Sequence, residues 1–462
     1  MSTRRISTEV RIGHLLLGGN NPIRIQSMAT VDTNDTEGCV AQAKRIIDAG
    51  GELVRFTTQG TREAENMRNI SARLKADGYT QPLVADVHFT AHTADVAAQY
   101  CEKVRINPGN YVDPGRTFKH LEYTDAEYAA ELQKIEQKLV PFINICKEHH
   151  TAVRIGVNHG SLSDRIMSRY GDTPEGIVES CMEFLRIFRR EQFNDVVISI
   201  KASNTVVMVQ TVRLLVKTMD AENMHYPLHL GVTEAGEGED GRIKSAVGIG
   251  ALLTEGIGDT IRVSLSEEPE CEIPVARKLV EMIDECTALR QEAERSIKDG
   301  TATLTLDAPD WETLQLKAAM SVGALLIDRK ATELTIRLEE GSKLSTLNSQ
   351  LSTLSDALLQ AARIKFTKTE YISCPGCGRT LYNLQETIEK VKAATSHLVG
   401  VKIGIMGCIV NGPGEMADAD YGYVGAGRAK ISLYRKKECV LKNIPEEEAV
   451  ERLLALIEEG QK

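Results

Sequence analysis

Three cysteines near the C-terminus have the residue type and spacing to hold a metal centre. Cys374 and Cys377 form a Cys-x-x-Cys pair in "SCPGCGR", and Cys408 follows in "GCIVNGPGE". A Cys-x-x-Cys pair by itself suits zinc, a redox disulfide or an iron–sulfur cluster. A zinc ribbon needs a second pair of the same spacing, and a thioredoxin-like site does not need Cys408. The set therefore favours an iron–sulfur cluster, which is normally held by four thiolates, and leaves one ligand position open.

Two residues compete for that fourth position. Cys439 lies in "YRKKECVLKN", a charged strand-like segment without a glycine turn, so we expect it to be structural or exposed. Glu415 follows Cys408 at the end of the same Gly-Pro-Gly loop, where a bend can return its carboxylate to the metal. A carboxylate is a harder and more labile ligand for iron than a thiolate, so it can give way to a substrate oxygen. The alternative is that Glu415 is an ordinary loop acid.

Five cations, each in a short β-branched run, form a second candidate set. They are Arg55, Arg105, Arg154, Lys201 and Arg262. If these runs are parallel strands of one barrel, the cations converge on one rim. Because arginine grips phosphate through two parallel N–H bonds, the rim predicts a phosphorylated or diphosphorylated small molecule, with Asn107, Asn158 and Ser203 as neutral donors. The alternative is a rim of arginines paired with Asp86, Glu234 or neighbouring acids.

The elements that must position these residues repeat a strand–helix pattern over the first 265 residues. Helix-like segments separate the runs, as at residues 173–190, where Thr173 and Pro174 suit the N-cap and the first helical position. The eight runs are "PIRIQSM", "ELVRFTTQG", "PLVADVHF", "KVRINPGN", "AVRIGVNHGS", "DVVISIKAS", "LHLGVTEAGEG" and "DTIRVSLSEE". Eight strands alternating with helices over about 250 residues are typical of an α/β protein with a (β/α)8 TIM barrel, and a doubly wound open sheet is the rival. The count favours the barrel.

Beyond the barrel the pattern changes, and we expect three parts in all. They are a substrate-binding barrel over residues 1–285, a middle region over 286–365 and a cysteine-bearing α+β domain over 366–462. The middle region has strand-like pieces at 301–309, 321–328 and 332–340. Leucines at helical spacing follow from Leu344 to Leu358, and we expect this face to pack on its own domain, with a partner or subunit contact as the alternative.

The composition limits which cell compartment and which kinds of partner we expect for this protein. The chain has 462 residues, ten cysteines and a net charge of −10. No stretch approaches the ~20 apolar residues of a membrane span, and the N-terminus lacks the apolar core of a signal peptide. We therefore expect a cytoplasmic protein whose reduced cysteines bind metal rather than form disulfides. The acidic balance argues against a nucleic-acid surface.

The motifs together resemble the 4-hydroxy-3-methylbut-2-enyl diphosphate synthase family of the methylerythritol phosphate pathway to isoprenoids. The likeness covers residues 5–280 and 365–445. It rests on "QSMATVDT", "VRFTTQG", "ADVHF", "KVRINPGN", "VRIGVNHGS", "VTEAGEGE", "IRVSLSEEP", "SCPGCGR" and "GCIVNGPGE". It implies a TIM barrel followed by an α+β domain like those of sulfite and nitrite reductases. The segment between them is of intermediate size, so the chain looks like a long-form member with a shortened insert.

The resemblance also implies roles for individual residues. A [4Fe–4S] cluster would be held by Cys374, Cys377, Cys408 and Glu415. The substrate would be bound by Arg55, Arg105, Asn107, Arg154, Asn158, Lys201, Ser203, Arg262 and Ser264. The catalytic residues would be Asp86, His88, Glu234 and Glu415, with Glu234 as the proton donor.

The implied reaction is the reductive ring opening and dehydroxylation of 2-C-methyl-D-erythritol 2,4-cyclodiphosphate, with electrons from flavodoxin or ferredoxin. In short forms of the family the cluster of one subunit covers the barrel of another, so a homodimer is one arrangement of the site. Two other interpretations stay open at this point. One is a barrel lyase or synthase for a phosphate ester with a structural zinc, and the other is a non-catalytic iron–sulfur sensor or electron relay.

Overall fold

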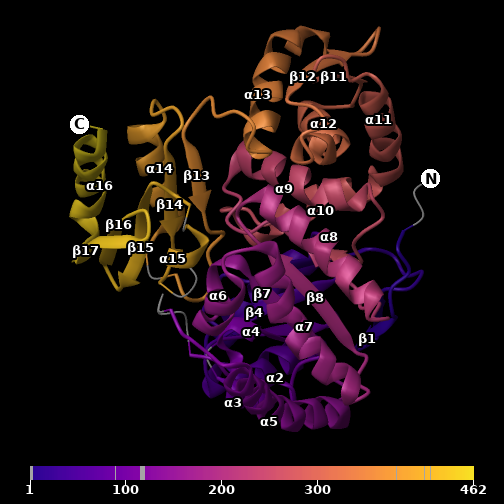
Figure 1. Ribbon diagram of the computed structural model, residues 1–462, viewed down its shortest axis with the longest axis vertical. Helices are drawn as coiled ribbons and strands as arrows, with labels where there is room; N and C mark the ends of the chain where they lie inside the picture. The colour runs from indigo at the N-terminus through magenta and orange to yellow at the C-terminus, as the bar shows by residue number, and fades with distance from the viewer. Residues whose placement is uncertain are drawn as a thin grey trace.

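The computed structural model describes residues 4–461 other than 89, 115–119, 381, 410, 411 and 417. Figure 1 shows three parts: a barrel in the lower half, a smaller layer at the upper right and a C-terminal domain at the left. Both later parts contact the barrel, so the chain folds back on itself after leaving it. Among the described residues, no helix is long and apolar enough to cross a membrane.

The first part is a closed barrel of eight parallel strands, as the sequence predicts. Its hydrogen-bonded order is β8-β7-β6-β5-β4-β3-β10-β9, and a bridge between Ile198 and Leu228 joins the two ends. Each strand falls within one of the eight β-branched runs. The strands are β3 (Arg24–Met28), β4 (Leu53–Thr58), β5 (Leu83–Val87), β6 (Lys103–Ile106), β7 (Ala152–Asn158), β8 (Val196–Lys201), β9 (His229–Leu230) and β10 (Thr260–Ile261).

Helices surround the barrel and cover its strands. Several of them begin at side-chain caps: at the start of α7, Thr173 accepts from the N–H of Gly176 and Pro174 occupies the first turn. The barrel helices are α1 (Thr36–Asp48), α2 (Thr61–Ala76), α3 (Ala91–Ala97), α4 (Pro108–Tyr111), α5 (Asp125–His149), α6 (Asp164–Tyr170), α7 (Pro174–Arg190), α8 (Thr205–Ala221), α9 (Gly238–Leu253) and α10 (Glu272–Glu281). The next helix, α11 (Ile283–Arg295), packs mainly on the middle region that follows it in the chain.

A short hairpin closes one end of the barrel. Strands β1 (Val10–Ile12) and β2 (Leu15–Leu17) form an apolar cluster with the first residues of the barrel strands. The barrel residues in this cluster are Leu53, Val84, Ala152 and Val197, all fully buried. Because the N-terminal end is plugged with hydrocarbon, a ligand can enter only at the C-terminal end, where the predicted cations lie.

The middle region is a strand–helix–strand–helix layer packed on the barrel helices. It consists of β11 (Thr301–Leu306), α12 (Trp311–Ile327), β12 (Glu333–Leu338), a 3-10 turn at Ser345–Gln350 and α13 (Leu351–Ala361). The prediction of a strand at 321–328 is wrong, because this run continues α12. Helix α12 is buried along almost its whole length, and an apolar run of this kind does not distinguish a buried helix from a strand.

Glycines let α12 lie directly against α9. A Cβ on Gly250 would lie 2.5 Å from Met320 Cγ, and one on Gly323 would lie 2.7 Å from the carbonyl of Val247. Leu351, Leu354 and Leu358 of α13 join the same hydrophobic core as the barrel. The leucine face therefore packs within the chain, as expected. The proposed boundaries at 285 and 365 stay predictions, since the layer and the barrel share one core.

The C-terminal domain is a five-stranded mixed sheet with helices on it. The strands are β13 (Glu370–Ser373), β14 (Lys402–Met406), β15 (Tyr421–Gly427), β16 (Lys430–Arg435) and β17 (Glu438–Pro445), in that order. The helices are α14 (Leu384–Thr395), the single turn α15 (Gly412–Glu415) and α16 (Glu446–Gln461). Strands β13 and β14 are parallel, so their C-terminal ends bring the Cys374 and Cys408 loops to one sheet edge, which faces the barrel mouth (Figure 1).

Candidate active site between the barrel and the cysteine domain

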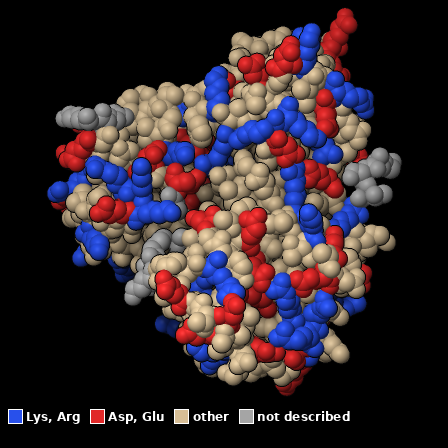
Figure 2. All heavy atoms as spheres, in the orientation of Figure 1, with Lys and Arg blue, Asp and Glu red and all other residues tan. Residues whose placement is uncertain are grey.

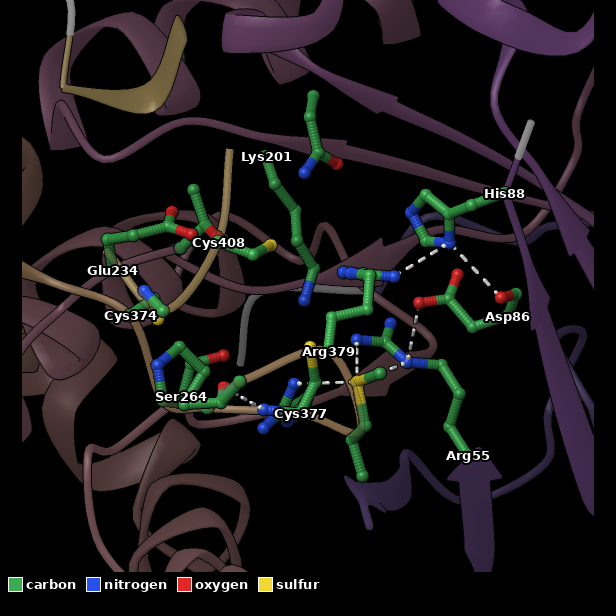
Figure 3. A pocket seen from close by; sticks show the side chains of 18 of the residues that line it. Arg55, Asp86, His88, Lys201, Glu234, Ser264, Cys374, Cys377, Arg379 and Cys408 are labelled. Atoms are coloured by element: carbon green, nitrogen blue, oxygen red, sulfur yellow. Dashed lines mark hydrogen bonds and ion pairs between the residues drawn. The ribbon is translucent and has the colours of Figure 1, made fainter. Parts of the chain in front are cut away.

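The open end of the barrel and the cysteine loops border one cleft, whose empty space, including the part open to solvent, is about 760 Å³. Figure 3 shows cations and acids of the barrel on one side and the cysteines on the other. Most of the residues singled out from the sequence line it. They are Arg55, Asp86, His88, Arg105, Arg154, Asn158, Lys201, Glu234, Arg262, Ser264, Cys374, Cys377 and Cys408.

Three of the predicted site residues lie beside the cleft rather than on its wall. The Asn107 amide donates to Ser161 Oγ over 2.8 Å and accepts from the N–H of Gly109, so it organises the turn after β6. The Ser203 hydroxyl donates to the main-chain carbonyl of Glu415 over 3.0 Å. Glu415 itself is 2% exposed. Asn107 and Ser203 therefore hold the loops beside the cleft through their side chains.

Two acids neutralise three of the five cations. Asp86 lies 3.1 Å from Arg105 and 3.7 Å from Arg55, and Glu272 binds Arg262 through both oxygens, at 2.8 and 2.9 Å. Burial opposes the charge on Asp86, but Arg55 and Arg105 outweigh it and hold its pKa well below the usual range. For Arg55, Arg105 and Arg262, the alternative prediction that the rim arginines pair with neighbouring acids is thus correct.

The other two cations have no acidic partner in the part of the chain that the structure describes. Arg154 is 1% exposed, and its Nε and Nη1 have no hydrogen-bond partner. Lys201 is 5% exposed and makes no ion pair among the described residues. Burial, and then the neighbouring arginines, lower the pKa of both groups well below their usual values. Such a pair is costly unless an anion meets it.

The cations of the rim lie inside the cleft, and the face of the molecule in Figure 2 shows no matching basic area among the described residues. Figure 2 shows basic and acidic side chains interspersed on the face that it presents, without a broad area of one sign among the described residues. Burial lowers the pKa of Arg55 to about 10, and Arg262 and Arg105 add to the effect by like-charge repulsion. A small anion that enters the cleft therefore meets desolvated cations, whose attraction is little screened by water.

The three predicted cysteine ligands line the same wall of the cleft. The Gly407 N–H donates to Cys374 Sγ over 3.2 Å, and burial, with Glu234 nearby, raises the pKa of Cys374 to about 12. A Cβ on Gly407 would lie 2.7 Å from Thr380 Oγ1, so glycine lets the two cysteine loops approach. Cys439 does not line the cleft; its thiol contacts the carbonyl of Leu441 on β17, as expected for a structural residue.

Two buried carboxyl groups stand beside the cysteines. Neither oxygen of Glu415 accepts a hydrogen bond of ordinary geometry, although the Gly160 N–H and the Asn158 side chain lie near enough to favour its ionised form. Burial, and then Glu234, raise the pKa of Glu415 well above its usual value. Glu234 has φ 49°, in the left-handed region, and its Oε2 is also without a partner. Burial raises the pKa of Glu234 as well.

This donor set suits a cluster better than a single ion. Among the described residues no three His, Cys, Asp or Glu side chains are arranged to hold one metal ion. The ligands of a cluster bind different irons and need not converge on one point. An iron–sulfur cluster would need thiol and carboxyl ligands, and the site has three thiols on one wall and a buried carboxyl group without ordinary hydrogen bonds.

Sequence reasoning missed Arg379, which is half-buried and lines the cleft. Arg379 follows the Cys-x-x-Cys-Gly sequence, and its Nη1 lies 3.0 Å from His88 Nδ1 on the barrel (Figure 3). Burial opposes its charge, but Cys377 and Cys408 outweigh burial and raise its pKa. The signal available in the sequence was an arginine directly after the second cysteine.

The cysteine domain docks on the barrel of its own chain through main-chain contacts. Gly160 and Gly414 touch so closely that a Cβ on either would overlap the other segment. The Ser266 hydroxyl donates to the carbonyl of Cys374 over 2.9 Å, and Ala235 forms a parallel bridge with Ser373. A single chain therefore supplies both walls of the cleft.

Fold and cleft together define a class: a TIM-barrel protein whose cationic mouth is covered by a cysteine-bearing α/β domain. The chain belongs to the GcpE family, since residues 7–277 match the GcpE TIM-barrel domain and residues 370–459 match the GcpE protein C-terminal domain. Neither match includes residues 278–369. These matches confirm the fold class and the family expected from the motifs.

Curated relatives extend the match to nearly the whole chain. The 4-hydroxy-3-methylbut-2-en-1-yl diphosphate synthase (flavodoxin) of Bacteroides fragilis is 53% identical over 98% of this chain and 96% of its own. That of Phocaeicola vulgatus is 52% identical over 98% of both chains. The first alignment runs over 602 residues against the 462 of this chain, so that relative has segments without a counterpart here. The protein is an oxidoreductase.

A solved structure with a similar barrel adds nothing about function. Dihydropteroate synthase from Xanthomonas albilineans is 12% identical, and the match covers 61% of this chain and 99% of that chain with a TM-score of 0.39. This similarity is too weak to assign a site.

Proposed function

We propose that the protein converts 2-C-methyl-D-erythritol 2,4-cyclodiphosphate to (E)-4-hydroxy-3-methylbut-2-enyl diphosphate and water, a two-electron reduction in isoprenoid precursor biosynthesis. One observation supports the proposal: Arg154 and Lys201 are buried without an acidic partner among the described residues, in the same cleft as three cysteines. A diphosphate satisfies the cations, and the cysteine wall then faces the carbon part of the same molecule. The curated relatives bear the name of this synthase.

The cations bind and orient the substrate. Arg154 and Lys201 contact the diphosphate, and Arg55, Arg105 and Arg262 complete the rim while Asp86 and Glu272 hold their guanidinium groups in place. Because these acids hold the planar guanidinium groups in fixed directions, the arginines can bind a diphosphate in only a few orientations. A single orientation brings the reacting carbons to the cysteine wall at high effective concentration. Asn158 and Ser264 add neutral donors at the same wall.

Cys374, Cys377, Cys408 and Glu415 would hold a [4Fe–4S] cluster, which supplies electrons one at a time and a Lewis-acidic iron. The three thiols and the buried carboxyl group of Glu415 support this ligand set. Docking of the cysteine domain excludes water from the cleft, because the loops around Gly160 and Gly414 pack in direct main-chain contact.

Glu234 serves as the proton donor for the departing oxygen. It is buried, its Oε2 has no hydrogen-bond partner among the described residues, and burial raises its pKa, which favours the protonated form that a proton donor needs. Its left-handed backbone fixes the direction of the side chain toward the cysteine wall (Figure 3). Asp86 and His88 lie on the opposite side of the cleft and orient Arg55 and Arg105.

The electron donor is a small carrier protein, and flavodoxin is favoured over ferredoxin because it appears in the names of the relatives. We place the enzyme in the cytoplasm, on the basis of its reduced-cysteine chemistry. Because one chain supplies both walls of the cleft, a homodimer is not needed to complete the site.

Anaerobic purification followed by iron, sulfide and zinc analysis tests the proposal together with turnover of the cyclic diphosphate. We expect a brown protein with iron and sulfide, which consumes the substrate when reduced flavodoxin is added. A zinc-filled centre would support the barrel lyase, and an intact cluster without turnover would support the sensor. The names of the relatives favour the synthase over both.

A further inference from the structure

One arginine of the middle region reaches both segments of the cysteine domain that lead to predicted cluster ligands. Arg363 Nη1 donates to the Asp418 carboxylate over 2.6 Å, and its Nη2 donates to Glu370 over 3.0 Å. Glu370 begins β13, which runs directly to Cys374. Asp418 lies three positions after Glu415, in what we call the Glu415 segment. A single planar guanidinium group therefore joins β13 to the Glu415 segment.

The main chain at Arg363 is held by the barrel and by the end of α12. The Thr205 hydroxyl, at the start of α8, donates to the carbonyl of Ala361 over 2.6 Å. Arg329, two positions after α12, donates to the carbonyls of Ala362 and Arg363 over 2.8 and 3.0 Å. These bonds satisfy carbonyl groups at the C-terminal end of α13, where a helix provides no partners of its own. The side chain of Arg363 thus begins at a fixed point.

The contacts form a closed circuit around the Glu415 segment. Ser203 and Thr205 lie two positions apart, where β8 passes to α8. Ser203 donates to the carbonyl of Glu415, and Thr205 binds the end of α13 that carries Arg363. Arg363 then returns to the Glu415 segment through Asp418. The segment is therefore fixed from two sides, by the barrel and by the middle region.

Strand β13 has further support, whereas the Glu415 segment has no second ion pair with the rest of the chain among the described residues. Glu370 is 8% exposed, and its Oε1 also lies 3.4 Å from Lys244 Nζ on α9. Lys368, just before β13, pairs with an acid in the first turn of α9 over 2.5 Å. Loss of the Arg363 side chain should therefore affect the Glu415 segment more than β13.

We propose that Arg363 is a positioning residue for the Glu415 segment, which sets the place of the Glu415 carboxyl group relative to the three thiols without touching substrate or cluster. The inference deepens the proposed function and rests on it for the role of Glu415. Arg363 lies outside both family domains, since neither match includes residues 278–369. A guanidinium group suits this role, because its planar fork can bind two carboxylates at a fixed separation and an ammonium group cannot.

The backbone at Arg363 offers a variant that removes only the fork. Its φ is 56°, in the left-handed region that glycine adopts without steric cost. Arg363→Gly therefore deletes the side chain and leaves a favoured residue at the end of α13. Lys436→Gly is the matched control, because Lys436 has φ 54°, is exposed and makes no ion pair among the described residues. Each variant loses one cation at a left-handed position.

Hydrogen–deuterium exchange of the full-length protein, followed by mass spectrometry, tests the positioning role. The N–H groups of Met416 and Ala419 donate to carbonyls within the Glu415 segment, so their exchange reports on its order. We expect roughly tenfold faster exchange of this segment in Arg363→Gly, with unchanged exchange in the barrel strands. Lys436→Gly should exchange as the wild type does.

A double-mutant cycle assigns the effect to the ion pair with Asp418. Asp418→Ala should reproduce the faster exchange of Arg363→Gly, and the double variant should be no faster than either single variant, because each already breaks the same pair. Steady-state kinetics and calorimetry add a second readout. Arg363→Gly should lower kcat roughly tenfold while KM and the affinity for inorganic pyrophosphate stay unchanged, because the cations of the barrel are untouched.

Three outcomes would overturn the proposal. They are wild-type exchange of the Glu415 segment in Arg363→Gly, additive effects of Arg363→Gly and Asp418→Ala, and equally faster exchange throughout the cysteine domain, which would show a general loss of stability. Exchange and pyrophosphate binding need no turnover, so they decide the role of Arg363 independently of the reaction. A wild-type protein without cluster or turnover would instead contradict the proposed function.

Discussion

The hydroxyl of Ser203, at the end of a barrel strand, donates a hydrogen bond to the main-chain carbonyl of Glu415 in the cysteine domain over 3.0 Å. The two residues are 212 positions apart in the chain. This bond fixes the backbone of the loop that carries Glu415, while the carboxyl group stays free of strong hydrogen bonds. The barrel thus positions a predicted cluster ligand of the other domain.

Close main-chain contact at the same place predicts that Gly160→Ala separates the domains. The added Cβ would lie 2.3 Å from Glu415 N, a distance at which the loop must move. A displacement of about 1 Å in a catalytic arrangement costs on the order of 100-fold in rate, so turnover should fall by about this factor. Solution scattering should show a larger radius of gyration. In Gly427→Ala the new Cβ meets only Lys430 Cβ at 4.0 Å, so this variant should behave as the wild type.

We predict different outcomes when the individual cysteines and Glu415 are replaced. Cys408→Ser should lose iron and sulfide as well as turnover, because serine does not replace a soft thiolate. Glu415→Ala should retain part of the cluster on three thiolates but lose turnover. Cys439→Ser should keep both, since that thiol lies on β17 away from the cleft. Metal and sulfide analysis with a turnover assay measures each, and full activity of Glu415→Ala with an intact cluster would contradict the ligand assignment.

Arg154 is buried, and no acid among the described residues pairs with its guanidinium group, so we predict that a variant without this charge is more stable but binds diphosphate more weakly. Arg154→Met removes a desolvated charge, so the ligand-free protein should gain about 1–4 kcal/mol of unfolding free energy. Pyrophosphate affinity should fall at least about tenfold, the equivalent of one charge-assisted hydrogen bond. Denaturant unfolding and calorimetry measure the two effects.

Arg262→Met is the matched comparison, because Arg262 pairs with the buried Glu272. Its removal leaves an uncompensated carboxylate and should destabilise the protein by about 3–5 kcal/mol. Equal changes in unfolding free energy in Arg154→Met and Arg262→Met would contradict the interpretation that the charge of Arg154 is balanced only when a ligand binds.

The lowered pKa of Lys201 predicts that diphosphate binding takes up protons. Burial and then Arg55 lower this pKa well below its usual value, so the ammonium loses its proton as pH rises through the lowered pKa in the free enzyme. A bound anion favours the charged form, and affinity should therefore fall as pH rises above the lowered pKa. Calorimetry of pyrophosphate in buffers of different ionisation enthalpy measures the uptake. Lys201→Gln should reduce it, and pH-independent binding without uptake would count against the role of Lys201.

Packing of the middle region on the barrel predicts a large effect of Gly250→Val. The new side chain would overlap Met320, whose Cα lies 2.8 Å from the position of the Cβ. Overpacking of this kind costs about 1–3 kcal/mol, and the loss should be seen in thermal unfolding of the whole chain because the two parts share one core. Unfolding of the insert alone, with an unchanged barrel transition, would show that the parts are independent.

Local pattern was enough to predict much of this protein. The eight β-branched runs gave the barrel strands, because a buried parallel strand is recognisable within a few residues. The same runs placed Arg55, Arg105, Arg154, Lys201 and Arg262 at one rim, since parallel strands end at the same edge. The cysteine motifs located the other wall. The run at 321–328 was wrongly predicted as a strand, because a short apolar stretch is compatible with a helix as well as with a strand.

The sequence by itself determined which residues could carry the chemistry, because their types and their places at strand ends and glycine turns are local properties. Only the tertiary structure decided which of them meet. It brought Arg379 to His88 across 291 positions, paired Arg262 with Glu272 and left Arg154 without an acidic partner among the residues that the structure describes. Charge balance in a cleft depends on contacts between distant segments, and no periodicity or motif along the chain records those contacts.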